Sequence, residues 1–435
     1  MRILFLFAIS LSLFQDYTQG QVPAGCDGVR NTEPLLYLTP QPLKTVQNGQ
    51  SWLIQQDTNV IYLAKVKGTP YQMGYALGQL YGKEIAKNIK NLANYGYFMF
   101  KDKLNVLDYL TEWQSWLIFH FVIEPLVLFS LDVDYLVTWI YTPERYAEEM
   151  RGIVAGSGGK ISYRHLQRFN LFAELSRAHC TILGAWGDAT ADGKLYHLRT
   201  LDWNPTAKVN EFPAIIIYEP SEAGSQQFAN IGYLGLIGSL TAMSRIGISV
   251  GEKVMYRKDG IDYNPTPEWT YFGKPWLYVL RDTIQFATNL QDVENMLLST
   301  QRTAMIHLGF ASVPDNTFRG VDYSSTDLIF YDDSNYTRYS STYHPQYDGI
   351  FYYDRHVQPS GSTCIKSILD SAHGSITPET LYRDVTGYHA SGDASVVVMD
   401  PAGGQLWLSY SLYGAELHAY KRSPIYMNLN QFWDL

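Results

Sequence analysis

Two runs of alternating apolar residues joined by Asp192-Gly193 constrain the fold of this chain more than any other stretch. The first run begins at Cys180 and the second ends at Asp202, and an Asp-Gly pair between such runs is typical of a tight β-hairpin. An antiparallel pair brings the end of its second strand beside the start of its first. The sequence therefore predicts that Arg199 and Asp202 lie near Cys180.

A thiol beside a guanidinium and a carboxylate has the parts of an activated nucleophile. The cation lowers the pKa of the thiol, and the carboxylate can orient an amine or a proton. The same residues also fit a buried cysteine in an ordinary strand that ends in a surface ion pair. The sequence has no Gly-x-Ser-x-Gly elbow, no His-Glu-x-x-His pair, no phosphate loop and no zinc-binding cysteine cluster. We therefore expect no metal and no cofactor, and structural roles for His307, His344 and His356.

The pattern Cys180-Thr181 at the start of one strand, with Arg199-x-x-Asp202 at the end of the next, resembles the start of the catalytic chain in N-terminal-nucleophile amidases. The nearest groups are the acid ceramidase and N-acylethanolamine amidase group and the penicillin acyltransferase group. The resemblance implies cleavage between His179 and Cys180, which frees the α-amine of the cysteine. It also implies that Arg199 stabilises the thiolate and orients the substrate, and that Asp202 holds the α-amino group.

Two further stretches match in order. Residues Gly68 to Gly74, with Gly78 after them, are similar to the Gly-x-Pro-Tyr-x-x-Gly motif of the acyltransferase-like branch, and residues Glu148 to Ile153 resemble its Glu-x-x-Gly-Ile helix end. The resemblance runs from about residue 60 almost to the C-terminus. It implies an αββα sandwich, with two antiparallel sheets between helical layers.

The candidate oxyanion-binding residues depart from the family pattern. Acid ceramidase-like enzymes place an asparagine in the strand that corresponds to Ile306–Phe310, and this chain has none there. Asn316, in the following loop, is the substitute that we expect. Arg319 corresponds to a second, substrate-binding arginine of that family. The departure puts ceramide as the specific substrate in doubt.

Element signals along the chain indicate an α+β protein, because hairpins are interleaved with helix pairs. Residues 21–57 show little periodicity and are expected to be irregular. Helices are predicted over 71–92, 143–156, 162–175, 276–287, 290–298 and from 377. Strands are predicted over 60–66, 212–218, 231–240, 246–250, 306–311, 327–331, 394–399 and 405–410.

The segment from about residue 105 to 140 is strongly apolar and aromatic. Glu124, Asp132 and Asp134 interrupt it, and carboxylates are costly in the interior of a membrane. Buried helices of a globular domain are therefore expected. The alternative is a hydrophobic surface that faces a membrane, which would suit a lipid amide substrate.

The N-terminus has the features of a secretory signal. A charged start is followed by an apolar run from Ile3 to Phe14, too short to span comfortably, and cleavage is expected near Gly20. An N-terminal anchor is the alternative. Asn335-Tyr336-Thr337 is a glycosylation sequon in a polar loop. We expect a glycoprotein that is secreted or lysosomal.

Three cysteines in a secreted chain leave one pair and one free thiol, or an intermolecular bond. Acid ceramidase-like enzymes join their light and heavy chains by a disulfide near the N-terminus of the light chain. The resemblance therefore implies a bond between Cys26 and Cys364. It divides the chain into a signal peptide, 1–20, a mostly helical light-chain segment, 21–179, and a catalytic chain, 180–435.

The resemblance implies an enzyme that acts on amide bonds. The net charge of −9 and the scattered basic residues argue against nucleic acid as a partner. The leading hypothesis is a self-processed cysteine amidase that hydrolyses an N-acyl substrate, a lipid in particular, through a thioester on Cys180. The alternatives are an acyltransferase on the same scaffold, a non-catalytic secreted binding protein, and a membrane-anchored structural protein.

Overall fold

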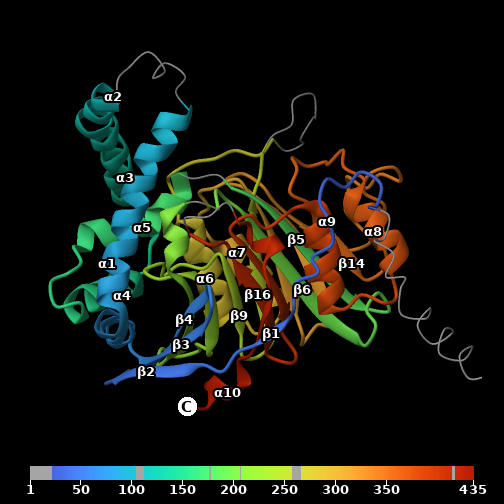
Figure 1. Cartoon of the computed structure of the whole chain (residues 1–435), viewed down its shortest axis with the longest axis horizontal. Helices are drawn as coiled ribbons and strands as arrows, with labels where there is room; N and C mark the ends of the chain where they lie inside the picture. Colours follow the sequence, from blue (N-terminus) through green and yellow to red (C-terminus); the bar gives the residue numbers. More distant parts are fainter. Residues whose placement is uncertain (1–21, 104–111, 176–177, 206, 257–265, 414–416) are drawn as a thin grey trace, which may run out of the picture.

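The computed structural model of this 435-residue chain describes residues 22–103, 112–175, 178–205, 207–256, 266–413 and 417–435. Two sheets lie face to face between two layers of helices (Figure 1). The predicted αββα order of an α+β protein is therefore confirmed. The predicted signal peptide, 1–20, lies outside the described residues.

The smaller sheet has seven strands and holds the predicted hairpin between β15 and the edge strand β14. In spatial order its strands are β1 (Leu36–Tyr37), β17 (Ile425–Asn428), β16 (Gln405–Tyr410), β15 (Ser395–Asp400), β6 (Gly193–Asp202), β5 (His179–Gly187) and β14 (Ile350–Tyr353). We call it the seven-stranded sheet.

The second sheet has ten strands. In spatial order they are β13 (Leu328–Tyr331), β12 (Thr317–Tyr323), β11 (Ile306–Ser312), β10 (Ile248–Val254), β9 (Thr241–Ser244), β8 (Phe228–Tyr233), β7 (Pro213–Pro220), β4 (Asn59–Gly68), β3 (Gly49–Gln56) and β2 (Gln41–Val46). The predicted strand over 231–240 is thus wrong beyond Tyr233. The chain turns there, and Gly235 has a φ of +96°.

Two strand pairings are parallel, β1 with β17 and β4 with β7, and the other pairings among the described strands are antiparallel. Both parallel pairings join a strand from before Cys180 to a strand from after it. The segments 21–179 and 180–435 therefore share both sheets, so a cut before Cys180 would not separate two independent folding units.

Both faces of each sheet are buried, which explains the continuous apolar runs in the strands. In β7, Ile215 and Ile217 face the other sheet, while Ile216 and Tyr218 face helices. The ten-stranded sheet is covered by α1 (Pro70–Lys103), α4 (Glu144–Gly156), α5 (Tyr163–Leu175), α6 (Trp276–Phe286) and α7 (Leu290–Ser299). The seven-stranded sheet is covered by α8 (Cys364–Ala372), η5 (Thr380–Val385) and α9 (Thr386–His389). Three short helices follow strands or loops: η4 (Lys208–Glu211), η6 (Ala419–Lys421) and α10 (Asn430–Trp433).

The two sequence motifs around Gly74 and Gly152 pack against each other in α1 and α4. A Cβ on Gly74 would lie 2.0 Å from the Glu149 carbonyl oxygen, and one on Gly152 would lie 2.2 Å from the Tyr71 carbonyl oxygen. Only glycine permits two helix backbones to approach so closely. These motifs therefore position a helix layer.

Residues 21–57 are more regular than predicted, because they contain β1, β2 and β3. Trp52 and Ile54 of β3 are buried between the sheets, whereas most of β2 is exposed at the sheet edge. The many Gln residues of this segment hide the alternation. Pairing with β4 over eight residues of β3 supplies the order that local sequence does not.

The predicted burial of the apolar segment 105–140 is wrong for the residues that the structure describes. A continuous helical run comprises α2 (Glu112–Ile118), η2 (Phe119–Ile123), α3 (Glu124–Thr138) and η3 (Trp139–Tyr141). Together with the far end of α1, it stands out from the sheets on one side (Figure 1). Within it, Trp116–Tyr141 is long and apolar enough to cross a membrane, with a mean hydropathy of 1.8 and only 11% of its most apolar window buried. We call Glu112–Tyr141 the arm.

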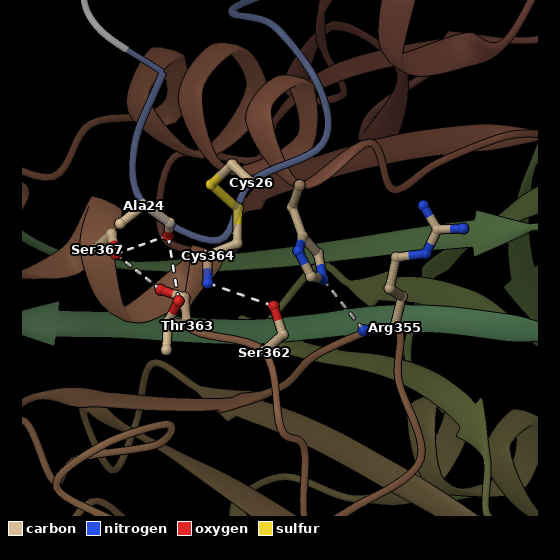
Figure 2. Close-up of a disulfide and its surroundings, with 8 residues drawn as sticks. Ala24, Cys26, Arg355, Ser362, Thr363, Cys364 and Ser367 are labelled. Carbon is tan, nitrogen blue, oxygen red and sulfur yellow. Dashed lines mark hydrogen bonds between the residues drawn. A yellow bond between two sulfur atoms is a disulfide. The ribbon is translucent and has the colours of Figure 1, made fainter.

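The predicted disulfide between Cys26 and Cys364 is confirmed, with a Cα–Cα distance of 4.6 Å (Figure 2). Hydrogen bonds to the backbone of the N-terminal segment also hold that segment against α8. Ser367 and Thr363, on and just before α8, donate hydrogen bonds to the Ala24 carbonyl oxygen at 2.9 and 3.3 Å. The bond ties the segment before Cys180 to the helix layer of the segment after it.

If the chain is cut before Cys180, this disulfide should hold the two fragments together. Electrophoresis of the processed protein without reductant should show one band, which splits into two on reduction. Cys26→Ser should give two bands without reductant. Two bands from the wild-type protein without reductant would contradict the bond.

Two buried carboxyl groups lie near each other at the base of the arm. Asp134 of α3 is 1% exposed and its carboxyl group has no hydrogen-bond partner among the described residues. Glu174 of α5 accepts a hydrogen bond from the Trp276 amide at 2.6 Å. Burial raises the pKa of Asp134 to about 7, and burial with the nearby Asp134 raises the pKa of Glu174 to about 8.

These pKa values predict that the protein is more stable in acid. The folded state holds both protons at a pH where the unfolded state has lost them, so the stabilisation is complete below about pH 4 and is lost as pH rises through about 8. The melting temperature of the wild-type protein should fall between pH 5 and pH 8. Asp134→Asn and Glu174→Gln should each make this fall smaller. Glu148→Gln, on an exposed side chain, is the control. An unchanged pH dependence in both variants would show that these carboxyl groups are hydrated.

Candidate active site

The hairpin of β5 and β6 places the predicted nucleophile at the centre of the molecule. Cys180 pairs with Leu201, and His179 pairs with Asp202. The turn uses Gly193 with a φ of +74°, a conformation that favours glycine. The Cys180 side chain is 0% exposed, and this cysteine is free.

Arg199 reaches the thiol as the hairpin predicts. Its Nη2 lies 3.7 Å from the Cys180 Sγ, and the same nitrogen donates to the Glu252 side chain. Its Nε donates to the Glu252 carbonyl oxygen at 3.4 Å. A Cβ on Gly251 would lie 2.7 Å from the Arg199 Cγ, so a glycine there leaves room for the guanidinium to pass. The structure therefore brings Cys180, Arg199 and Glu252 together.

Asp202 lies beside the peptide bond between His179 and Cys180, which is predicted to break. Backbone amides and a hydroxyl group hold its carboxylate in place. Its carboxylate accepts hydrogen bonds from the Ser391 hydroxyl at 3.0 Å, from the Gly392 amide, and from the Asp393 amide at 3.3 Å. Asp202 is the cross-strand partner of His179, the residue before Cys180. Asp202 therefore lies close to the backbone nitrogen of Cys180. Burial raises the pKa of Asp202.

Glu252 and Lys253 are site residues that sequence reasoning missed. Glu252 forms an ion pair with Arg199, and both side chains are at least 96% buried. Lys253 is 0% exposed, donates a hydrogen bond to the Val254 carbonyl oxygen at 3.3 Å, and interacts electrostatically with the thiol. Burial lowers its pKa. The sequence feature that could have identified them is the pair of adjacent charged residues inside the apolar strand β10. Successive side chains of a strand point to opposite faces, so both charges cannot point into solvent.

In the uncut chain the pKa of the thiol is raised, although Arg199 lowers it as expected. Burial raises the pKa of Cys180, and the nearby Glu252 raises it further, while Arg199 lowers it by a smaller amount. The guanidinium is already paired with Glu252, so part of its charge is neutralised. The uncut chain therefore holds a protonated thiol, and an additional base is needed to activate it.

The other predicted site residues lie elsewhere. Asn316 has a φ of +47° and is exposed at the turn between β11 and β12, at the opposite end of β11 from His307 and Lys253. Its expected role at the oxyanion is therefore not supported. Arg319 is half-buried and donates to the Phe318 carbonyl oxygen at 3.2 Å, with Asp332 4.0 Å away.

Asn335, the predicted glycosylation site, is exposed between β13 and β14. Its side chain accepts a hydrogen bond from the Asp332 amide at 2.7 Å. Its exposure is compatible with a glycan, and glycosylation stays a prediction.

Histidines gather on the other side of the bond between His179 and Cys180. The His179 ring stacks on Tyr256 with ring centroids 5.1 Å apart, and its Nδ1 lies 3.1 Å from the Arg355 carbonyl oxygen. Asp354, His356 and His389 bring their ligand atoms within 4.8 Å of one another, as a metal site could. Hydrogen bonds already engage the ligand atoms of two of these residues: the His356 amide and the Gln358 side chain donate to Asp354, and the Arg355 amide donates to His389. The cluster thereby supports the strand end that carries His179.

An apolar cavity of about 100 Å³ is lined by neighbours of Cys180 and Arg199. Leu201, which pairs with Cys180, and Glu252, which binds Arg199, both line it. Tyr233 lies on the same wall, and its ring is 5.6 Å from the ring of Tyr410. The remaining lining is Leu92, Phe169, Phe172, Ala173, Ala178, Trp203, Asn210, Leu236, Leu240, Val254 and Trp276. We call it the inner cavity.

Comparison with known proteins gives two curated relatives from Dictyostelium discoideum. Protein dcd1A is 30% identical over 457 residues, covering 100% of this chain and 99% of dcd1A. Protein dcd1B is 30% identical over 373 residues, covering 84% of this chain and 71% of dcd1B. No protein-family model matches the chain.

Among solved structures, an N-acylethanolamine-hydrolyzing acid amidase ortholog from Caenorhabditis elegans is similar with a TM-score of 0.39 and 15% identity. The match covers 56% of this chain and 98% of that chain. A likeness this distant carries no argument about activity. The match to dcd1A extends over almost the whole length of both chains. This chain therefore belongs to the family of the Dictyostelium proteins dcd1A and dcd1B.

Proposed function

We propose that this protein is a self-processed cysteine amidase, which hydrolyses the amide bond of an N-acyl substrate through a thioester on Cys180. One observation supports this above the others. A fully buried thiol at the start of β5 lies 3.7 Å from a buried guanidinium, and Leu201, the cross-strand partner of Cys180, lines an apolar cavity. A cysteine with only a structural role would not need the Arg199–Glu252 pair to be buried beside it, because burying charges is costly.

Processing supplies the missing base. Hydrolysis of the peptide bond between His179 and Cys180 leaves a carboxylate on His179 and an α-amine on Cys180. Such an amine has an ordinary pKa of about 8, so it can take the thiol proton near neutral pH. Asp202, held by residues 391–393, is positioned to bind the resulting ammonium group. Cleavage also opens the strand end and so reduces the burial that raises the thiol pKa.

The catalytic cycle needs only groups of this chain and water. The Cys180 thiolate attacks the amide carbonyl carbon while its proton rests on the α-amine. The C–N bond breaks, the amine product leaves with that proton, and the acyl group stays as a thioester. Water then attacks the thioester, and the acid is released as the thiol is restored. Arg199 and Lys253 place two positive charges beside the developing negative charge.

The inner cavity favours an apolar acyl group, because aliphatic and aromatic side chains dominate its lining. Hydrolysis should therefore improve with acyl chain length. We expect kcat/KM to rise about 10-fold or more from an acetyl to a long-chain N-acyl amide, since each buried CH₂ contributes about 0.8 kcal/mol. A fluorogenic amide series with one amine and increasing acyl length measures this. A preference for short polar acyl groups would contradict it.

The same assay tests the acyltransferase alternative. An added primary amine should leave the yield of free acid largely unchanged if water is the acceptor. Conversion of most of the acyl group to a new amide would assign transfer instead. We further propose that the reaction takes place in the secretory pathway or the lysosome, which the disulfide and the predicted signal peptide support.

A further inference from the structure

The arm presents an apolar stripe to solvent. Along its outer side Val122, Leu126, Phe129, Val133, Leu136 and Ile140 follow one another at alternating spacings of four and three residues. Leu126, Phe129, Leu136 and Ile140 are each between 57% and 76% exposed. Such spacing gathers side chains on one face of a helix. A continuous exposed apolar face of this kind marks a docking surface.

Three acidic side chains of the arm, Asp132, Asp134 and Glu124, are paired or buried. Asp132 binds Arg168 with oxygen–nitrogen distances of 2.8 and 2.6 Å, and it also binds Arg164. Asp134 is buried, and Glu124 lies 2.6 Å from the His120 Nδ1. The arm contains no lysine or arginine. Its outer face is therefore apolar and carries no exposed charge among these groups.

This pattern favours a lipid bilayer over a partner helix. A coiled-coil seam is flanked by charged residues that set partner and register. Here the stripe is flanked by exposed Phe121, Val127 and Trp139, and exposed Trp113 and Trp116 lie towards one end. Tryptophans at the ends of an apolar helix are typical of membrane interfaces.

A large cavity separates the arm from the body. It has a volume of about 890 Å³, within the range of ligand pockets, and lies between α1, the arm and α5. Leu92, Phe169 and Phe172 line both this cavity and the inner cavity. Exposed Lys90 and Lys160 also line it, which favours anionic headgroups at its mouth.

We propose that the outer face of the arm lies in the interfacial layer of a lipid bilayer, and that a lipid acyl chain passes from the bilayer through the arm cavity to the inner cavity. The proposal that the arm docks on a bilayer depends only on the exposed apolar face of the arm. The delivery step rests on the proposed amidase function.

Docking is tested by sedimentation with lipid vesicles, using the full chain carrying Cys180→Ala so that no hydrolysis occurs. The probe is vesicles of phosphatidylcholine, with and without phosphatidylserine. The triple variant Leu126→Ser, Phe129→Ser, Leu136→Ser should bind at least about 10-fold more weakly. These side chains are exposed, so the variant should fold. The matched control is Tyr37→Ser, Phe272→Ser, Leu298→Ser, which removes equally exposed apolar side chains elsewhere and should bind like the parent.

Equal vesicle binding by the parent and the triple variant would overturn docking by the arm. So would a dimer of the parent in solution, measured by light scattering without vesicles, that the triple variant loses, because a second copy would then cover the face.

Delivery is tested with active chain on two substrates. The triple variant should hydrolyse a long-chain N-acyl amide embedded in vesicles at least about 10-fold more slowly, and a soluble short-chain amide at the parental rate. Equal losses on both substrates would overturn delivery along the arm. If neither substrate is hydrolysed by the parent, the proposed function fails, and with it delivery, while the vesicle result still decides docking.

Discussion

Replacing Cys180 with alanine should leave one full-length chain after reduction and no detectable amide hydrolysis. The thiol is the only proposed nucleophile for both reactions, so processing and turnover are lost together. Removing the nucleophile of a covalent mechanism lowers kcat by about 10⁴-fold or more. Reducing electrophoresis and a hydrolysis assay on the same preparation measure both effects.

Cys180→Ser is the matched control, because it keeps a nucleophile of similar size in the same buried place. Slow cutting of Cys180→Ser with an intact Cys180→Ala would assign the cut to the side chain itself. Cys180→Ala chain that is cut at the same bond would instead show that another protease does it, and active uncut enzyme would exclude the α-amine as the base.

Replacing Arg199 with leucine should have the second largest effect, because it changes both stability and reactivity. The substitution leaves Glu252 buried without its partner, and breaking a buried ion pair costs about 3–5 kcal/mol. It also removes the cation that lowers the pKa of the thiol. We expect kcat/KM to fall by about 10²- to 10³-fold, and alkylation of the processed thiol by iodoacetamide to shift to higher pH.

A double variant separates these two effects. Arg199→Leu with Glu252→Leu removes both charges, so the melting temperature should recover much of the loss seen in Arg199→Leu alone. Activity should stay low, since the guanidinium is still missing. Recovery of activity together with stability would mean that Arg199 serves the fold only. An alkylation profile unchanged by Arg199→Leu would mean that its charge does not act on the sulfur.

Local chemistry predicted much of this fold. Asp192-Gly193 fixes a two-stranded turn, which sets the register that brings Arg199 beside Cys180. Helix signals work equally well where a cap exists: α7 was predicted over 290–298, and the side chain of Asn289 before it accepts a hydrogen bond from the Asp292 amide. In both cases the interacting groups are close in sequence, so the pattern itself contains the answer.

Contacts between distant segments could not be predicted in the same way. Glu252 reaches Arg199 from β10 of the other sheet, and no local pattern connects the two strands. The arm shows a different limit, because an apolar helix has the same composition whether it packs in a core or faces lipid. The thiol pKa depended on burial, which the residues nearest Cys180 in sequence do not report.

The intact mass of the reduced large fragment, measured before and after incubation with a long-chain N-acyl amide, tests the proposed nucleophile and its processing together. Before incubation, the mass should equal that of a chain beginning at Cys180, apart from any glycan. After acid quenching at short times, a population should have gained the mass of the acyl group less one hydrogen atom, and hydroxylamine should remove it. A fragment that begins elsewhere, or an acyl group that maps to any residue other than Cys180, would contradict the proposed mechanism.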